Sequence, residues 1–200
     1  MKKFIVLAVA AAACSTSAFA QVSNFTGPSV GVNLDHTAVS NQITDASTDL
    51  DGLGQQSVGV SLQAAYGFDL SPSSVLSIGA TYSLTDAKAG HIKDNSTVTF
   101  KGKNAYSIYL EPGILISDKT LAYGKVSYES VKMSAEDTGG SDSKNINGVG
   151  YGFGIRTMLD KAWSLQAEVK HVKYGSEALD STTTFKTSAT IGTIGLGYKF

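Results

Sequence analysis

The chain has little of several residue types on which other protein classes depend. It contains one cysteine, Cys14, three prolines and a single arginine, Arg156. One cysteine excludes a disulfide framework within the chain. Beyond residue 20 no apolar run reaches the ~20 residues that a membrane-spanning helix needs. The formal net charge is −1, and no basic cluster indicates a nucleic-acid surface.

The N-terminus carries an export pattern. Lys2 and Lys3 precede an apolar run over residues 4–13, and Ala18-Phe19-Ala20 is a small-residue cleavage motif. We predict a signal peptide over residues 1–20, cleaved between Ala20 and Gln21. The mature part, residues 21–200, then has 14 basic and 17 acidic residues and fits one domain.

A lipoprotein is the alternative interpretation of this leader. It would require acylation of Cys14 after cleavage behind Ala13. The leader would then be very short, and alanine would stand where a bulkier aliphatic residue is usual, so we favour cleavage after Ala20.

The last ten residues alternate strictly between two kinds of side chain. Ile194, Leu196, Tyr198 and Phe200 form an apolar set, and small or polar residues lie between them. A period of two predicts a strand with one apolar face. Seven earlier segments show the same alternation: residues 29–37, 57–69, 76–84, 106–111, 122–129, 149–156 and 163–170.

The connections between these eight segments are alternately short and long. Short turns are expected at residues 70–74, 117–120 and 159–162, and long polar loops at 38–55, 85–103, 132–147 and 174–188. The apolar faces carry no charged residue, whereas a lipocalin-like barrel would have its apolar residues inside. We therefore predict an all-β fold, an eight-stranded antiparallel up-and-down transmembrane β-barrel with periplasmic short turns.

Aromatic residues gather at the two expected rims of the apolar belt. In the predicted barrel one rim would contain Tyr66, Phe68, Trp163, Tyr198 and Phe200, and the other Tyr82, Tyr106, Tyr128 and Tyr151. Two aromatic girdles are typical of the two membrane–water interfaces.

Two positions do not fit this scheme simply. Pro112 cannot donate a hydrogen bond to a neighbouring strand, so a bulge is expected at Pro112-Gly113, and it would blur the facing of residues 114–116. Tyr123 faces inward by strict alternation, although an aromatic side chain near that rim would also fit outside. The sequence does not decide whether Tyr123 faces the lumen or the lipid.

Charged residues occupy the inner face of four predicted strands. They are Glu111, Lys125, Glu129, Arg156, Glu168 and Lys170. Folding the short turns places Lys125 beside Glu111 and Glu168 diagonal to Arg156, whose guanidinium can bind two carboxylates. The network is either a gate or a closed polar plug. We favour the plug because eight strands leave little lumen.

Three stretches resemble a known family. The run at residues 148–156, the Leu-Gln-Ala-Glu-Val-Lys stretch at 165–170 and the terminal Gly-Leu-Gly-Tyr-Lys-Phe resemble the small outer-membrane barrels, a group that includes OmpX-like, opacity-like and OmpA-transmembrane-domain proteins. The resemblance implies an inner charge network and a C-terminal aromatic, Phe200, that the barrel-assembly machinery reads. Val169 stands where an aromatic is common, and no periplasmic domain is expected after Phe200.

Patterns for chemistry are weak. His36, His91 and His171 do not have the spacing of metal ligands. Lipid-modifying barrel enzymes have a His-x-Ser arrangement, and His171-Val-Lys173 does not match it. The acidic residues of the first loop, Asp45, Asp49 and Asp51, match no calcium loop. The glycines at 148–154 lie within a predicted strand and indicate close packing around the inner charges instead of a phosphate loop. We predict no catalytic residue, cofactor or metal site.

We therefore expect a monomeric, non-enzymatic outer-membrane protein of a Gram-negative cell. Its role would be envelope structure or surface interaction through four extracellular loops. A narrow channel for small solutes is the first alternative and a lipid-modifying enzyme the second. The expected partners are membrane lipid, the assembly machinery and an unknown surface ligand, with no nucleic acid.

Overall fold

The computed structural model describes residues 22–44, 49–93, 97–137, 140–175, 177–178 and 184–200, and next to the gaps it describes the backbone only. The predicted leader, residues 1–20, and Gln21 lie outside these ranges. The one helical element among the described residues is the 3₁₀ turn η1 (Val22–Asn24). No helix in this part of the chain is long and apolar enough to cross a membrane.

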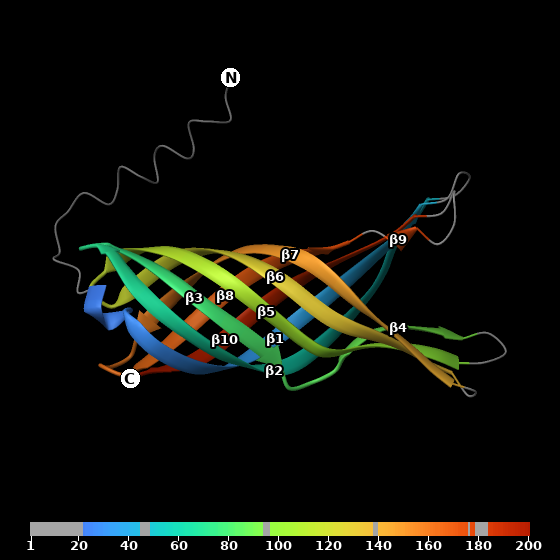
Figure 1. Ribbon diagram of the computed structural model, residues 1–200, viewed down its shortest axis with the longest axis horizontal. Coiled ribbons are helices and arrows are strands. Elements are labelled where there is room, and N and C mark those ends of the chain that lie inside the picture. The colour runs from blue at the N-terminus through green and yellow to red at the C-terminus, as the bar shows by residue number, and fades with distance from the viewer. Residues whose placement is uncertain (1–21, 45–48, 94–96, 138–139, 176, 179–183) are drawn as a thin grey trace, which may run out of the picture.

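Eight strands form a closed antiparallel barrel (Figure 1). Each strand pairs with the next, and β1 also pairs with β10, which closes the ring. The eight are β1 (Gly27–Thr44), β2 (Asp49–Ser71), β3 (Ser74–Ser83), β5 (Thr97–Ser117), β6 (Thr120–Asp137), β7 (Gly140–Met158), β8 (Trp163–Tyr174) and β10 (Thr184–Lys199). Two short strands, β4 (Ala87–Lys93) and β9 (Glu177–Ala178), pair with β5 and β10. The predicted up-and-down barrel of eight strands is confirmed.

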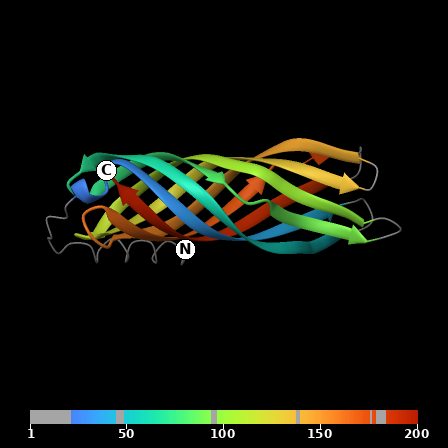
Figure 2. The ribbon, with the colours of Figure 1, turned by 90° about the horizontal axis from the view of Figure 1, so that it is seen from below.

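The strands are longer than the sequence pattern predicted. Three tight connections lie at one end of the barrel as expected, but much of the four long polar segments is strand, not loop. In β6 and β7, for example, backbone pairing continues from Lys132–Asn145 to Asp137–Gly140. The prediction was wrong there because apolar alternation stops where lipid ends, whereas backbone hydrogen bonding does not need lipid. The paired strands therefore project from the other end of the barrel (Figure 2).

The outer wall is apolar, as the alternation predicted. Val32, Phe153 and Ile194 are 53%, 70% and 61% exposed on the isolated chain, so lipid can cover them. At one rim Trp163 and Tyr198 lie 5.1 Å apart between ring centroids. At the other rim Tyr82 is paired with Tyr106. The two girdles thus lie where they were expected.

Pro112 makes no bulge. The register between β5 and β6 is the same at Leu110–Val126 as at Gly113–Tyr123, and β3 pairs with β5 through Leu76–Pro112 without a shift. Pairing with β6 is interrupted opposite Glu111 and Pro112, where the proline has no N–H to donate. Alternation therefore continues, with Leu115 buried inside and its two neighbours outside.

Candidate functional site in the barrel lumen

The centre of the lumen is an ionic cluster around Glu111 on β5, whose side chain is fully buried. Its Oε1 lies 2.8 Å from Arg156 Nη2 and its Oε2 lies 3.4 Å from Lys125 Nζ, so both contacts are ion pairs. Lys125 also contacts Glu168 of β8. Two acids and two bases from four strands thus neutralise one another, as buried charges require.

A second ion pair lies beside this cluster. Lys170 Nζ donates to Glu129 Oε1 at 2.6 Å, and both side chains are about nine-tenths buried. Ser127 Oγ donates to the same oxygen at 2.6 Å. The structure therefore places all six predicted charges inside the barrel and pairs them as acid with base.

The second partner of Arg156 differs from the one that the sequence predicted. Instead of a second carboxylate, its Nε and Nη2 donate to Gln166 Oε1 at 3.2 and 3.0 Å. The register explains this, because Gln166 is directly opposite Arg156 while Glu168 is opposite Gly154. Glu168 is bound by Lys125 and by Tyr123, whose Oη donates to it at 3.0 Å.

Two inner tyrosines support the cations. The Lys125 Nζ lies 4.3 Å from the ring centroid of Tyr109, and the Arg156 guanidinium carbon lies 5.2 Å from that of Tyr123. Both rings are buried, at 2% and 4% exposed, so the side of Tyr123 is settled as inward. Such contacts add attraction at a desolvated site. Tyr109 is two residues from the inner residue Glu111 and so shares its face, but alternation could not reveal this contact.

Three amide side chains complete the layer on the opposite wall. Gln166 Nε2 donates to Asn33 Oδ1 at 2.9 Å and to Gln63 Oε1 at 3.0 Å, and Asn33 Nδ2 donates to Gln63 at 3.3 Å. They join β8, β1 and β2. Together with the ionic cluster and the two tyrosines they form what we call the polar layer. Sequence reasoning missed the amides, although their inward, long, polar side chains were a usable signal.

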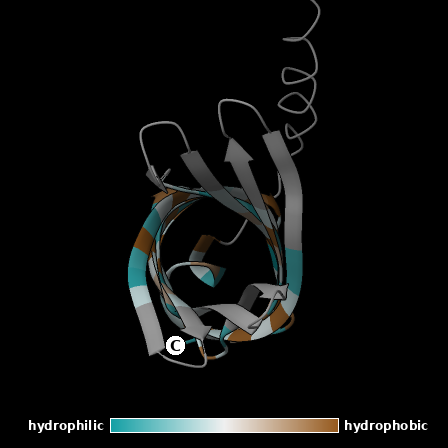
Figure 3. Cartoon of the chain, turned by 90° about the vertical axis from the view of Figure 1, so that its right-hand side faces the viewer, coloured by the Kyte–Doolittle hydropathy of each residue, from teal (hydrophilic) through white to brown (hydrophobic). Residues whose placement is uncertain are grey.

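Below the polar layer the lumen is closed by an apolar floor. Phe25, which follows η1, packs with Val75, Leu115, Leu121, Tyr123 and Met158. Seen along the barrel axis, η1 lies within the ring of strands (Figure 3). Asn24 Nδ2 donates to the Asp118 carbonyl at 3.0 Å and Lys199 Nζ donates to the Ser23 carbonyl at 2.5 Å, which ties η1 to a turn and to β10. The sequence analysis did not predict this floor.

Inner glycines make room for these groups. A Cβ on Gly154 would lie 2.6 Å from the Ala167 carbonyl oxygen and from Tyr123 Oη, and one on Gly152 would lie 2.6 Å from the Val169 carbonyl oxygen. Real side chains do not tolerate such distances. The interpretation of the 148–154 run as close packing around the inner charges is confirmed.

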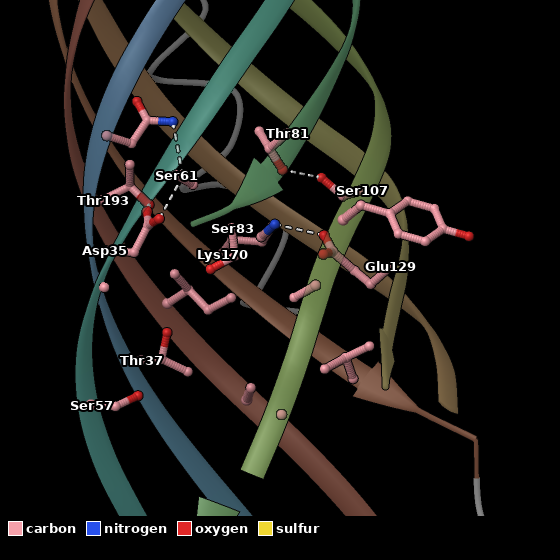
Figure 4. A pocket seen from close by; sticks show the side chains of 18 of the residues that line it. Asp35, Thr37, Ser57, Ser61, Thr81, Ser83, Ser107, Glu129, Lys170 and Thr193 are labelled. Carbon is pink, nitrogen blue, oxygen red and sulfur yellow. Dashed lines mark hydrogen bonds and ion pairs between the residues drawn. The ribbon is translucent and has the colours of Figure 1, made fainter. Parts of the chain in front are cut away.

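The space left in the lumen is unequal on the two sides of the polar layer. On the side of the tight turns a cavity of about 30 Å³ remains, and on the side of the projecting strands one of about 140 Å³. Figure 4 shows side chains that line the second of these cavities. Hydroxyl groups and acidic side chains line much of the larger cavity. We call it the vestibule.

Residues considered for chemistry lie away from the lumen or outside the described side chains. His36 is exposed on the outer wall, and His171 packs on Tyr151 there and hydrogen-bonds Thr190 at 3.1 Å. His91 and the three first-loop aspartates have no described side chain. Within the described ranges no group of three or more His, Cys, Asp or Glu residues could hold a metal ion.

The terminal strand has its predicted neighbours. β10 pairs with β1 and with β8, and the Phe200 N–H donates to the Pro28 carbonyl at 3.1 Å. Ile194, Leu196, Tyr198 and Phe200 all lie on the outer wall. Recognition of Phe200 by the assembly machinery stays a prediction.

Comparison with known proteins agrees with this architecture. The sequence model of the outer membrane protein beta-barrel domain matches residues 6–200. OprG of Pseudomonas aeruginosa is 11% identical with a TM-score of 0.54, covering 88% of this chain and 96% of that one. Ail, the attachment invasion locus protein of Yersinia pestis, is 16% identical with a TM-score of 0.50, covering 88% and 100%.

At these identities the two structures share the fold alone, and no curated protein sequence matches the chain. The family match, in contrast, covers nearly the whole sequence. With the apolar outer wall and the closed ring of eight strands, it identifies the chain as a member of the outer membrane protein beta-barrel domain family, located in the Gram-negative outer membrane.

Proposed function

We propose that the protein is a closed, non-enzymatic barrel that serves envelope structure or surface interaction and does not conduct solutes. The observation that carries this proposal is the double closure of the lumen by the polar layer and the apolar floor. Arg156, Lys125 and Glu111 are held by one another, so opening the layer would separate several buried charges. A separated buried charge costs several kcal/mol, on the order of 3–5 kcal/mol for a broken pair.

The same contacts argue against an enzyme. The buried acids and bases are occupied with one another, and the two described histidines lie on the outer wall facing lipid. Neither His36 nor His171 has a hydroxyl nucleophile and a carboxylate together beside it among its described contacts.

Planar-bilayer recording separates the closed barrel from the channel alternative. We expect no reproducible conductance steps from the purified protein at any voltage the bilayer tolerates. Steps that recur in every preparation and change in size with Arg156→Gln would contradict the proposal, because that side chain lies in the layer that closes the lumen.

The surface role would belong to the paired strands that extend beyond the belt. Ail, whose fold is similar, is named for attachment and has been solved with the heparin analogue sucrose octasulfate. Its likeness supports only that such a barrel can present a binding surface. The partners we propose are lipid around the belt, the barrel-assembly machinery at β10 and a ligand on the projecting hairpins, with a monomeric barrel.

Shortening the projecting hairpins distinguishes the two roles. Because Ser134 still pairs with Ser143, residues 135–142 can be replaced by a two-residue turn without disturbing the pairs below. A surface role predicts that equivalent shortening of all hairpins abolishes adhesion of cells while the barrel still assembles. If adhesion is unchanged and only deletion of the whole barrel weakens the envelope, the role is structural.

A further inference from the structure

The vestibule lies directly above the polar layer and has walls of two kinds. Next to the polar layer its lining is polar and includes Asp35, Ser61, Thr81, Ser107 and Thr193 (Figure 4). Farther toward the projecting hairpins it includes apolar side chains from four strands: Val39, Val131, Met133, Ile146 and Ala189. We call these five the apolar collar.

Asp35 is the distinctive group of the polar part. Ser61 Oγ donates to its Oδ2 and Thr193 Oγ1 to its Oδ1, both at 2.6 Å. These bonds orient the carboxylate but use only about two of its four acceptor positions. No ion pair of Asp35 occurs within the described residues, so its charge is met by hydroxyl dipoles and not by a cation.

The remaining charges of the vestibule do not supply a cation for Asp35. Lys170 is bound to Glu129 at 2.6 Å, and Lys125 is bound to Glu168 and Glu111. The one other acid in the lining, Asp86, is exposed. The vestibule therefore carries an excess of negative charge, and it attracts positive charge.

The apolar collar adds a second preference. Val131 and Ala189 are 7% and 3% exposed, and the other three members are half-buried around the cavity. An apolar wall with a few fixed polar groups is the usual make-up of a small-molecule site. A ligand that fits both parts has a positive head and a short apolar body.

We propose that the vestibule binds a small amphipathic cation, a primary ammonium with a short hydrocarbon group. The ammonium donates to Asp35, and the hydrocarbon lies within the apolar collar. Entry is from the side of the projecting hairpins, because the other side is closed by the polar layer and the apolar floor. The proposal goes beyond the structural or surface role and does not depend on which of the two is correct.

The test uses the folded barrel in nanodiscs of zwitterionic lipid and butylammonium as the probe. Titration followed by backbone amide NMR should give saturable shifts at Asp35, Thr193 and Ala189. Butanol tests the apolar body without the charge, and butanoate tests the opposite charge. We expect butylammonium to bind at least tenfold more tightly than butanol and butanoate not to bind.

Two variants locate the site, and both are first shown to fold by their heat-modifiable gel mobility. Asp35→Asn keeps acceptors for the hydroxyls and should lower butylammonium affinity at least tenfold. Asp118→Asn, in a turn at the other end, is the matched control and should bind as the parent does. Val131→Ser should weaken butylammonium more than methylammonium, and it provides the test if Asp35→Asn does not fold.

The outcomes are decisive in each direction. Shifts confined to lipid-facing residues would mean partition into the bilayer and would overturn the proposal. So would the absence of saturable shifts, or equal affinity in the parent and the Asp35 variant. A bilayer conductance found in the experiment of the preceding section would refute the closed barrel but not this site, so the two failures are distinguishable.

Discussion

The two halves of the lumen are enclosed by the same eight strands, yet one is filled and the other is hollow. In the filled half the inner positions hold long side chains, such as Arg156, Lys125 and Tyr109, that meet in the middle. In the hollow half the inner positions are mostly short, such as Ser61, Thr81 and Ser107. An eight-stranded barrel is just wide enough for long side chains to fill. Side-chain length along each strand, and not the number of strands, therefore decides where this barrel is closed.

The largest effect is expected from the centre of the filled half. Glu111→Ala leaves Lys125 and Arg156 without their shared carboxylate in a buried site. We expect the free energy of unfolding to fall by about 3–5 kcal/mol, measured by urea titration in lipid vesicles with gel mobility as the readout. The parallel change Asp35→Ala in the vestibule removes a half-buried carboxylate that has no ion pair among the described residues, and it should cost much less. Equal losses would mean that the two halves do not differ as described.

The apolar floor should be nearly as sensitive. Phe25→Ala empties a site enclosed by Val75, Leu121 and Met158, and we expect a loss of about 3 kcal/mol in the same titration. Phe153→Ala removes the same ring from the lipid face, where lipid refills the space, and is the matched control. If Phe153→Ala were the more damaging of the two, the floor would not contribute as a packed core.

Glycine substitutions probe the filled half from within the wall. Gly154→Ala brings a Cβ to 2.6 Å from a carbonyl oxygen and from Tyr123 Oη, and we expect a loss of about 2 kcal/mol. Gly192→Ala is the control, since no atom of the described residues lies within 4 Å of its added Cβ on the outer wall. The difference between the two variants should appear in unfolding midpoints. If Gly154→Ala left the unfolding midpoint unchanged, the polar layer would be able to rearrange at little cost in free energy.

The smallest effect concerns a turn outside both halves. The backbone N–H groups of Trp163 and Ala162 donate to Asp160 at 2.7 and 2.8 Å, which lowers the pKa of that exposed carboxyl. Because the folded pKa is lowered, the ionised carboxylate stabilises the folded protein at pH values above the unfolded pKa of about 4. This stabilisation is lost as the pH falls through the lower folded pKa. Asp160→Asn should remove this small acid-side dependence of the unfolding midpoint. An unchanged pH profile would contradict the assignment.

Much of the outer wall could be predicted from the sequence, because lipid imposes a simple rule on every second residue. The alternation that placed Ile194 and Phe153 outside also placed Glu111 and Arg156 inside. Pro112 was misjudged, since one missing donor on the β6 side does not require a bulge. The strand ends were missed because polar residues on both faces leave no period to detect.

The interior was less predictable, because its contacts join residues that are distant in sequence. Arg156 contacts Gln166 because the register of β7 and β8 places the two residues opposite each other. The sequence of either strand alone does not give that register. The apolar floor forms because Phe25 packs against Val75 and Met158, which are far from it in sequence. The vestibule depends on which short inner side chains share a level, and that follows from the stagger of all eight strands.

The difference between the two halves is tested most directly by cysteine labelling at two positions of β1. Thr37 lines the vestibule and Ser29 lines the small cavity on the side of the tight turns, and both are half-buried. Each is changed to cysteine in a Cys14→Ser background and exposed, in intact porin-deficient cells, to a small cationic thiol reagent. Labelling of both in urea-unfolded protein is the control. We expect Thr37→Cys to react and Ser29→Cys to stay unlabelled. Comparable labelling of both would show a lumen open from end to end, and labelling of neither would show that the outer half is not hollow.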